Sequence, residues 1–330
     1  SFKLERLIKK AAKILYLIGI ALVTVIIAAG IAVQAPGVQT RAARKAISMI
    51  SDKIDGRIEV GKIHANPFKA VVIKDIAIID TNPFTDSAGN VACDTLFRAE
   101  YITATFGLKS LLGGAGFHLN TATVENAMMY LSIEPGDSIS SSNNLKRIFR
   151  LKKRTEEKEK SDKEVFSISK VRIRNMAFLM ENFRKDQSKF GEGGINWFDM
   201  EVRDINISGR KLRMRGPVMS GLCDSLSFRE KSGYVCRRIS GDATVGNGKT
   251  SITSLHIADN WSDIYFPEFV MTYENTASWS EFVTAVRMTG HIDRSHVSLG
   301  TIGYFAPSLA GKTMEADLDG DVDGFVSRLS

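Results

Sequence analysis

The sequence contains few cysteines, prolines and histidines. Only 3 of the 330 residues are Cys, which excludes a small secreted scaffold held by many disulfides. With 7 Pro and 27 Gly, the chain is neither collagen-like nor proline-rich. The 5 His are scattered, and neither a G-x-S-x-G nor an H-E-x-x-H motif occurs. We therefore expect a folded protein that is not an enzyme and needs no cofactor and no metal.

Charge is absent from residues 14 to 33, which read ILYLIGIALVTVIIAAGIAV. At about 1.5 Å per residue, a helix of this length spans about 30 Å, the thickness of a bilayer's hydrocarbon core. The preceding residues 1–13 carry five Lys or Arg and one Glu, a charge of +4, and such flanks stay in the cytoplasm. The pattern predicts a single transmembrane helix with a cytoplasmic N-terminus. In a bacterium this helix would lie in the inner membrane, and the bulk of the chain in the periplasm.

The three cysteines, Cys93, Cys223 and Cys236, are odd in number, so at most two of them can pair. Cys223 and Cys236 could lie on the arms of a hairpin that turns near residues 230–233. A four-residue turn there would place Phe228 or Ser227 opposite Cys236. A disulfide and free thiols both remain open at this point.

Positive charge is concentrated in three segments, although the net charge of +7 suggests a uniformly basic protein. The N-terminal flank, residues 41–53 and residues 146–164 together carry +11, so the rest of the chain is mildly acidic at −4. The sequence shows no basic face with interleaved aromatics, which argues against nucleic acid as a partner. The first two segments flank the predicted anchor, where anionic headgroups are the natural partners.

After the anchor, residues 34–56 predict one amphipathic helix, and residues 57–330 predict a mainly β domain. A short helix is expected at residues 107–112. Residues 138–144 and 154–164 lack both apolar periodicity and turn motifs, so residues 138–164 predict a disordered insertion. Within it, Leu145, Ile148, Phe149 and Leu151 could form one short amphipathic helix.

An internal repeat of the form apolar-x-x-apolar-x-apolar-x-Asp/Asn recurs along the β domain. Copies begin at Ile73, Leu119, Ile168 and Ile252, and a variant copy begins at Val202. Within a copy, alternate residues face opposite sides of the sheet, so Val171 and Ile173 oppose Arg172 and Arg174. A sheet with one apolar face needs a cover, and no further amphipathic helices are available. The sheet must curl on itself, pair with another sheet, or leave an apolar trough. An ordinary sandwich or closed barrel also fits the pattern.

The order of these segments resembles the N-terminal part of the TamB family, a group of AsmA-like envelope proteins. The resemblance is carried by the anchor, by APGVQTRAARKAISMISDKIDGRIEVGKI, by FKAVVIKDIAIID, by FRAEYITATFGLKSLLGG and by HLNTATVENAMMYL. The Lys/Glu-rich insertion followed by FSISKVRIRNMAFLMEN is similar to the version found in Bacteroidota.

The resemblance implies an elongated, curled antiparallel β-sheet with an open hydrophobic groove, called a β-taco. It also implies an inner-membrane protein that supports outer-membrane biogenesis through phospholipid transport, beside a BamA/TamA-like barrel. Contact with that barrel lies in the family's C-terminal part. The present chain begins with Ser1 and stops within a strand pattern, so we expect a fragment of a longer protein.

Three short motifs resemble functional sites. Residues 246–250, GNGKT, look like the end of a P-loop but run from strand to strand, which predicts a hairpin turn. Asp319, Asp321 and Asp323 match the start of an EF-hand loop, but its twelfth position is Ser330, so they predict a strand with alternating acids. His291, Asp293 and His296 match no metal-ligand spacing.

The leading hypothesis is a lipid conduit, in which acyl chains lie against the apolar face of the sheet. The candidate lining residues are Ile76, Ile78, Val124, Val171, Ile173, Ile205, Ile207, Leu255 and Ile257. The alternative is a scaffold for outer-membrane protein assembly that binds client strands at its sheet edges.

Overall fold

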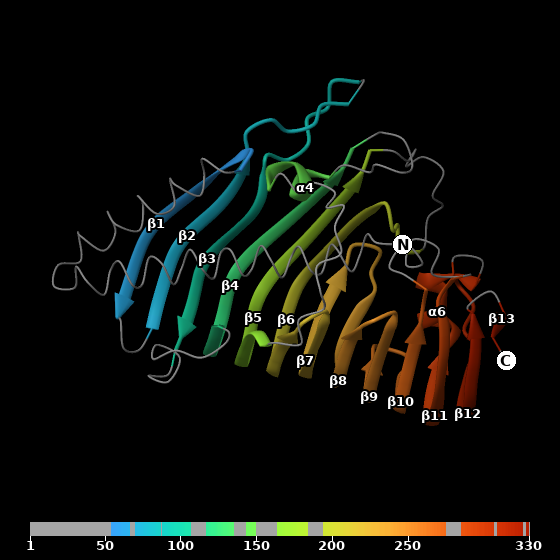
Figure 1. Cartoon of the computed structure of the whole chain (residues 1–330). Coiled ribbons are helices and arrows are strands. Elements are labelled where there is room, and N and C mark those ends of the chain that lie inside the picture. Colours follow the sequence, from blue (N-terminus) through green and yellow to red (C-terminus); the bar gives the residue numbers. More distant parts are fainter. Residues whose placement is uncertain are drawn as a thin grey trace.

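A computed structural model describes residues 54–66, 70–86, 88–106, 117–134, 143–149, 164–183, 194–274, 285–306, 309–325 and 328–329. These residues form one open 13-stranded sheet, in which every strand is followed in space by the next strand of the sequence (Figure 1). The strands are β1 (Gly56–Asn66), β2 (Ala70–Asp80), β3 (Thr95–Thr105), β4 (Phe117–Ile133), β5 (Glu164–Asn182), β6 (Asp199–Arg215), β7 (Val218–Glu230), β8 (Val235–Gly246), β9 (Lys249–Ala258), β10 (Asp263–Thr272), β11 (Arg287–Ser298), β12 (Glu315–Phe325) and β13 (Arg328–Leu329). Two short helices accompany them, α4 (Asn144–Ile148) and α6 (Leu299–Phe305).

The sheet is long and curled, as expected, but it is not antiparallel throughout. Strands β4 and β5 pair in parallel, with Val124 opposite Ile173, whereas the other neighbouring strands are antiparallel. A parallel pair needs a crossover of a dozen residues or more. Residues 134–163 connect the two strands, so the segment we expected to be a disordered insertion belongs to the crossover after which β5 runs in the same direction as β4.

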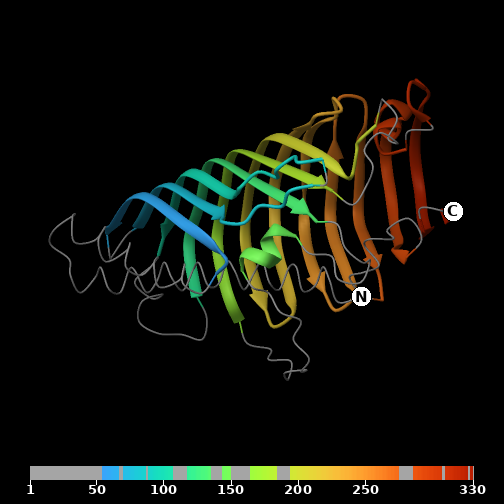
Figure 2. The ribbon, with the colours of Figure 1, turned by 90° about the horizontal axis from the view of Figure 1, so that it is seen from above.

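Helix α4 lies within this crossover and corrects the expectation that no helix covers the sheet. Leu145 and Ile148 are buried in a cluster with Ile78 and Leu96, so α4 packs on the same face of the sheet as these two side chains. Figure 2 shows α4 inside the curve of the sheet, so this face is concave. We call it the inner face and the opposite side the outer face.

The strands bend where a residue adopts a left-handed backbone conformation. Positive φ angles occur in β2, β4, β5, β6 and β9, at Asp75, Asn126, Asn175, Asp204 and Ser254. Asn and Asp tolerate this conformation better than most residues, and an inserted residue of this kind bends the strand and increases its twist. Inward-facing residues are therefore three apart across each bend, as in Ile73 and Ile76 or Ile173 and Met176.

The final Asp or Asn of the sequence repeat occupies two different structural positions. Asn126 and Asn175 lie at exposed bends in the middle of strands. Asp80 ends β2 and Asp259 follows β9, both buried, with 3% and 1% of their surface exposed. There, each carboxylate accepts backbone N–H bonds from the following turn, from Asn82 and from Trp261 respectively.

The predicted anchor and the expected helices at 34–56 and 107–112 lie outside the described residues, apart from residues 54–56, of which Gly56 already begins β1. Among the residues that the structure describes, no helix is long and apolar enough to cross a bilayer.

Candidate functional site: the apolar inner face

One row of aliphatic side chains crosses the inner face from β1 to β10. Directly paired residues of neighbouring strands share a face, so the pairing register defines the row. It takes one residue from each strand, and we call it the central row: Ile63, Ile73, Ile102, Val124, Ile173, Ile207, Leu226, Ile239, Ile257 and Ile264. No charged or polar residue interrupts it.

Further apolar rows run beside the central row. One consists of Val60, Ile76, Ala99, Ala127, Met176 and Ile205, and the next of Ile58, Ile78, Phe97, Met129, Phe178 and Val202. On the other side lies a row of small residues: Val71, Ala104, Ala122, Val171, Gly209, Cys223 and Gly241. On the inner face, the row of small residues therefore lies directly beside the central row of larger aliphatic side chains.

The nine residues singled out from the sequence all lie on this face. Val124, Ile173, Ile207 and Ile257 belong to the central row, and the others occupy neighbouring rows or, for Leu255, pair with inward Phe266. Ile76, Ile78 and Leu255 are buried, whereas Val124, Val171, Ile173, Ile205, Ile207 and Ile257 are half-buried.

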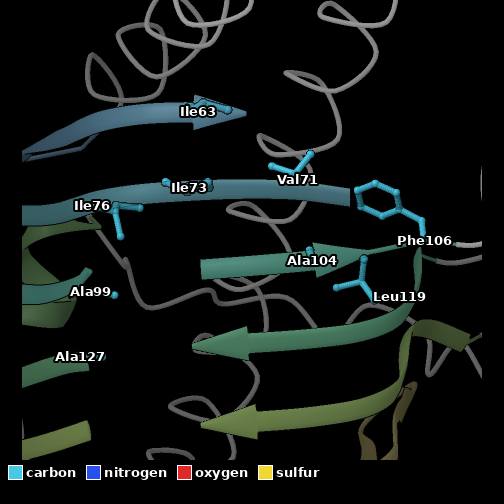
Figure 3. Close-up of a cluster of buried hydrophobic side chains, with 9 residues drawn as sticks. All are labelled: Ile63, Val71, Ile73, Ile76, Ala99, Ala104, Phe106, Leu119 and Ala127. Carbon is cyan, nitrogen blue, oxygen red and sulfur yellow. The ribbon is translucent and has the colours of Figure 1, made fainter. Parts of the chain in front are cut away.

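Burial of the inner face changes along the sheet. At β1 to β4 the side chains form a packed cluster that includes Ile63, Ile73 and Leu119 (Figure 3). Helix α4 closes the adjoining region, where Arg147 forms ion pairs with Asp80 and Glu134. In the central row, Ile63 and Ile73 are buried, whereas the members from β3 onward are half-buried, so apolar surface remains accessible there.

The outer face is polar at the corresponding positions. Arg172 and Arg174 are exposed next to inward Ile173, and Arg174 lies 3.2 Å from Glu125 of β4. Along the line of bends, Asn175 donates to Asn126 at 2.8 Å, and Asn126 donates to Glu100 at 2.5 Å. This contrast confirms the predicted opposition of Val171 and Ile173 to Arg172 and Arg174.

A buried polar network joins α6 to the turn between β9 and β10. Asp259 Oδ1 accepts from the backbone of Trp261 and Ser262, and Oδ2 accepts from Thr301 Oγ1 at 2.7 Å. Tyr234 packs beside this network, and its burial raises the pKa of its hydroxyl above the ordinary value. Both carboxylate oxygens of Asp259 thus have partners, which indicates a structural role for this carboxylate.

The cysteines are free thiols in the structure. The hairpin turns after Glu230, and Phe228 lies opposite Cys236, as a four-residue turn predicts. Cys236 is 1% exposed, and this burial raises the pKa of its thiol to about 11. Cys223 faces the inner side, where its thiol contacts the carbonyl of Ile239.

The first two look-alike motifs adopt the structures expected of them, a hairpin turn and a strand with alternating acids. Asn247 and Gly248 form the turn between β8 and β9, with φ of 55° and 74°. Asp319, Asp321 and Asp323 alternate along β12, and His291 and His296 pair separately with Asp321 and Asp317. Within the described ranges, no group of three or more His, Cys, Asp or Glu side chains is arranged to hold a metal ion.

Sequence reasoning missed most of the inner face. Five members of the central row fall outside the repeat copies, because their alignment depends on register: Ile63, Ile102, Leu226, Ile239 and Ile264. It also missed α6, whose only local signal is the N-cap Ser298, which accepts from Gly300 N–H.

Comparison of the chain with protein-family models, with curated proteins and with solved structures found no match.

Proposed function

We propose that this protein conducts phospholipids along its inner face between the inner and outer membranes and so supports outer-membrane biogenesis. The central row is the observation that carries the proposal, because it gives an unbroken apolar path across ten consecutive strands. The role is one of binding and transfer, without catalysis. It is also the role implied by the resemblance to the TamB family.

The physical basis is the cost of exposing acyl chains to water, about 0.8 kcal/mol for each CH₂ group. Many similar aliphatic sites in a row allow a chain to move from one site to the next without a deep energy minimum. At about 4.8 Å per strand, the row from β1 to β10 extends for about 43 Å. The polar headgroup would remain in solvent at the open side of the curve.

A charged substitution on the inner face tests this proposal in a vesicle-to-vesicle phospholipid transfer assay. Ile257→Asp places a carboxylate in the central row, and we expect transfer to fall at least tenfold. Ser251→Asp is the matched control, because Ser251 is on the outer face of the same strand, next to inward Ile252. Equal transfer by the two variants, with unchanged circular dichroism, would contradict the conduit.

A protein-assembly scaffold is the second candidate, and the open sheet favours it. Among the residues that the structure describes, strand β1 has a hydrogen-bonded neighbour on one side only, so its other edge can accept an additional strand. Such binding would depend on the backbone of the edge strand and would not respond to Ile257→Asp.

A further inference from the structure

The outer face carries a group of cations on β5 and β6. Lys170, Arg172 and Arg174 alternate along β5, and Arg210 and Arg213 lie beside them on β6. All five are exposed. Counting charges along the sequence did not reveal this group, because the cations come from separate segments that the register brings together.

Several of these cations lack a carboxylate partner in the part of the chain that the structure describes. Arg174 pairs with Glu125 and Arg210 with Asp224, whereas no ion pair is found for Lys170, Arg172 or Arg213. Lys170 is also directly opposite Arg210 in the register. Like charges in this arrangement are destabilising, so an external anionic partner would relieve the repulsion.

The same face carries a row of acids at β12. Glu315, Asp317, Asp319, Asp321 and Asp323 alternate along the strand and are all exposed. The residues that alternate with these acids along β12 face inward, since Gly324 pairs with Met288 and Val322 with Gly290. Arg287 and Arg294 of β11 are the permanent cations beside these five acids, and His291 and His296 add charge only when protonated.

The two charge ladders match in spacing but cannot meet within one molecule. Alternate residues of a strand are about 6.7 Å apart, so the carboxylates of β12 repeat at the same distance as the cations of β5. Six strand intervals separate β6 from β12, or about 29 Å on the same side of one sheet. Only a second molecule can bring a β12 ladder against a β5 ladder.

We infer that the outer face is a self-association surface, on which β12 of a second copy of this chain pairs with β5 and β6. Two copies related by a two-fold axis place each acidic ladder on the partner's basic ladder, so both contacts form at once. The inner faces then point away from each other and stay accessible. This inference does not depend on the proposed lipid transport.

Charge-exchange variants of the 330-residue chain in detergent test this pairing by sedimentation velocity. One variant carries Arg172→Glu and Arg213→Glu, and the other carries Asp319→Lys and Asp321→Lys. We expect the wild-type chain to dimerise, with a dissociation constant at least tenfold weaker in 0.5 M than in 0.05 M NaCl. Each variant alone should stay monomeric. An equimolar mixture should dimerise again, because every contact then joins opposite charges.

Circular dichroism and the melting temperature show whether each variant is folded. For folded variants, dimers that persist in both, or a mixture that stays monomeric, would overturn the inference. A wild-type chain that is monomeric at all concentrations would do the same. As a second measurement, vesicles with anionic lipid are added to the wild type and to the Arg172→Glu, Arg213→Glu variant. Vesicle binding that requires these arginines in a monomeric protein would assign the patch to a membrane and overturn self-association.

Discussion

At the scale of single residues, a few side chains decide where each strand bends. Asn175 adopts φ of 52°, and its backbone N–H donates to Asn206 Oδ1 at 3.1 Å. A β-branched residue is strained in this left-handed conformation, whereas Gly adopts it freely. The identity of such residues was visible in the sequence, but their place in the fold was not. Asn126 and Asn175 were aligned with Asp80 and Asp259, although the two pairs occupy different positions.

We expect Asn175→Val to lower the free energy of unfolding by about 1–2 kcal/mol, because it forces a β-branched residue into positive φ. Asn175→Gly should stay within about 0.5 kcal/mol of the wild type, since the strain is absent and one exposed hydrogen bond is lost. Urea unfolding followed by circular dichroism measures both. Equal stability of the Val and Gly variants would show that the bend does not require this conformation.

At the scale of elements, contacts remote in sequence place the helices and set the strand order. Helix α4 was foreseen as a possible amphipathic helix from Leu145 and Ile148, but its contact with Ile78 and Leu96 was not, because those residues precede it by some 50 to 70 positions. The parallel pairing of β4 and β5 was missed although the long connection between them was recognised. Its length was the available signal, since a hairpin needs only a short loop.

The network around Asp259 attaches α6 to the sheet. In Asp259→Ala, the backbone N–H groups of Trp261 and Ser262 and the Thr301 hydroxyl lose their shared acceptor. Buried donors without partners are costly, so we expect a loss of about 2–4 kcal/mol in the free energy of unfolding. Asn260→Ala, at the exposed neighbouring position, is the control and should change it little. A similar small effect in both variants would argue against a structural role for the network.

The pairing of β11 with β12 should depend on pH through His291 and His296. Hydrogen bonds to Asp321 and Asp317 raise the pKa of these two histidines above the usual value of 6.5, and the nearby Asp319, Asp293 and Glu315 act in the same direction. A histidine whose pKa is higher in the folded state stabilises the fold fully at pH values below its unfolded-state pKa. This stabilisation is lost as the pH rises through its folded-state pKa. We therefore expect β12 amides to be better protected from hydrogen exchange at pH 6 than at pH 8, after correction for intrinsic rates. The double variant His291→Asn, His296→Asn should lose this difference, and its persistence there would assign the effect to other groups.

At the scale of the whole molecule, alternation along strands predicted a sheet with one apolar face, whereas the curled form was implied by the resemblance to the TamB family. The central row could not be predicted, because it is a property of register across ten strands and each strand contributes one residue to it. The separation of the cations on β5 and β6 from the acids on β12 could not be predicted for the same reason. Local pattern determines which face a side chain takes, whereas pairing determines which side chains become neighbours.

The most direct test of the account is photo-crosslinking in cells from the two central-row positions Ile173 and Ile257, with outward Ser251 as the control. Adducts would be identified by mass spectrometry. The account predicts phospholipid adducts at Ile173 and Ile257 and none at Ser251. Identical labelling at all three positions, or protein adducts alone at the two inward positions, would contradict a lipid-conducting inner face.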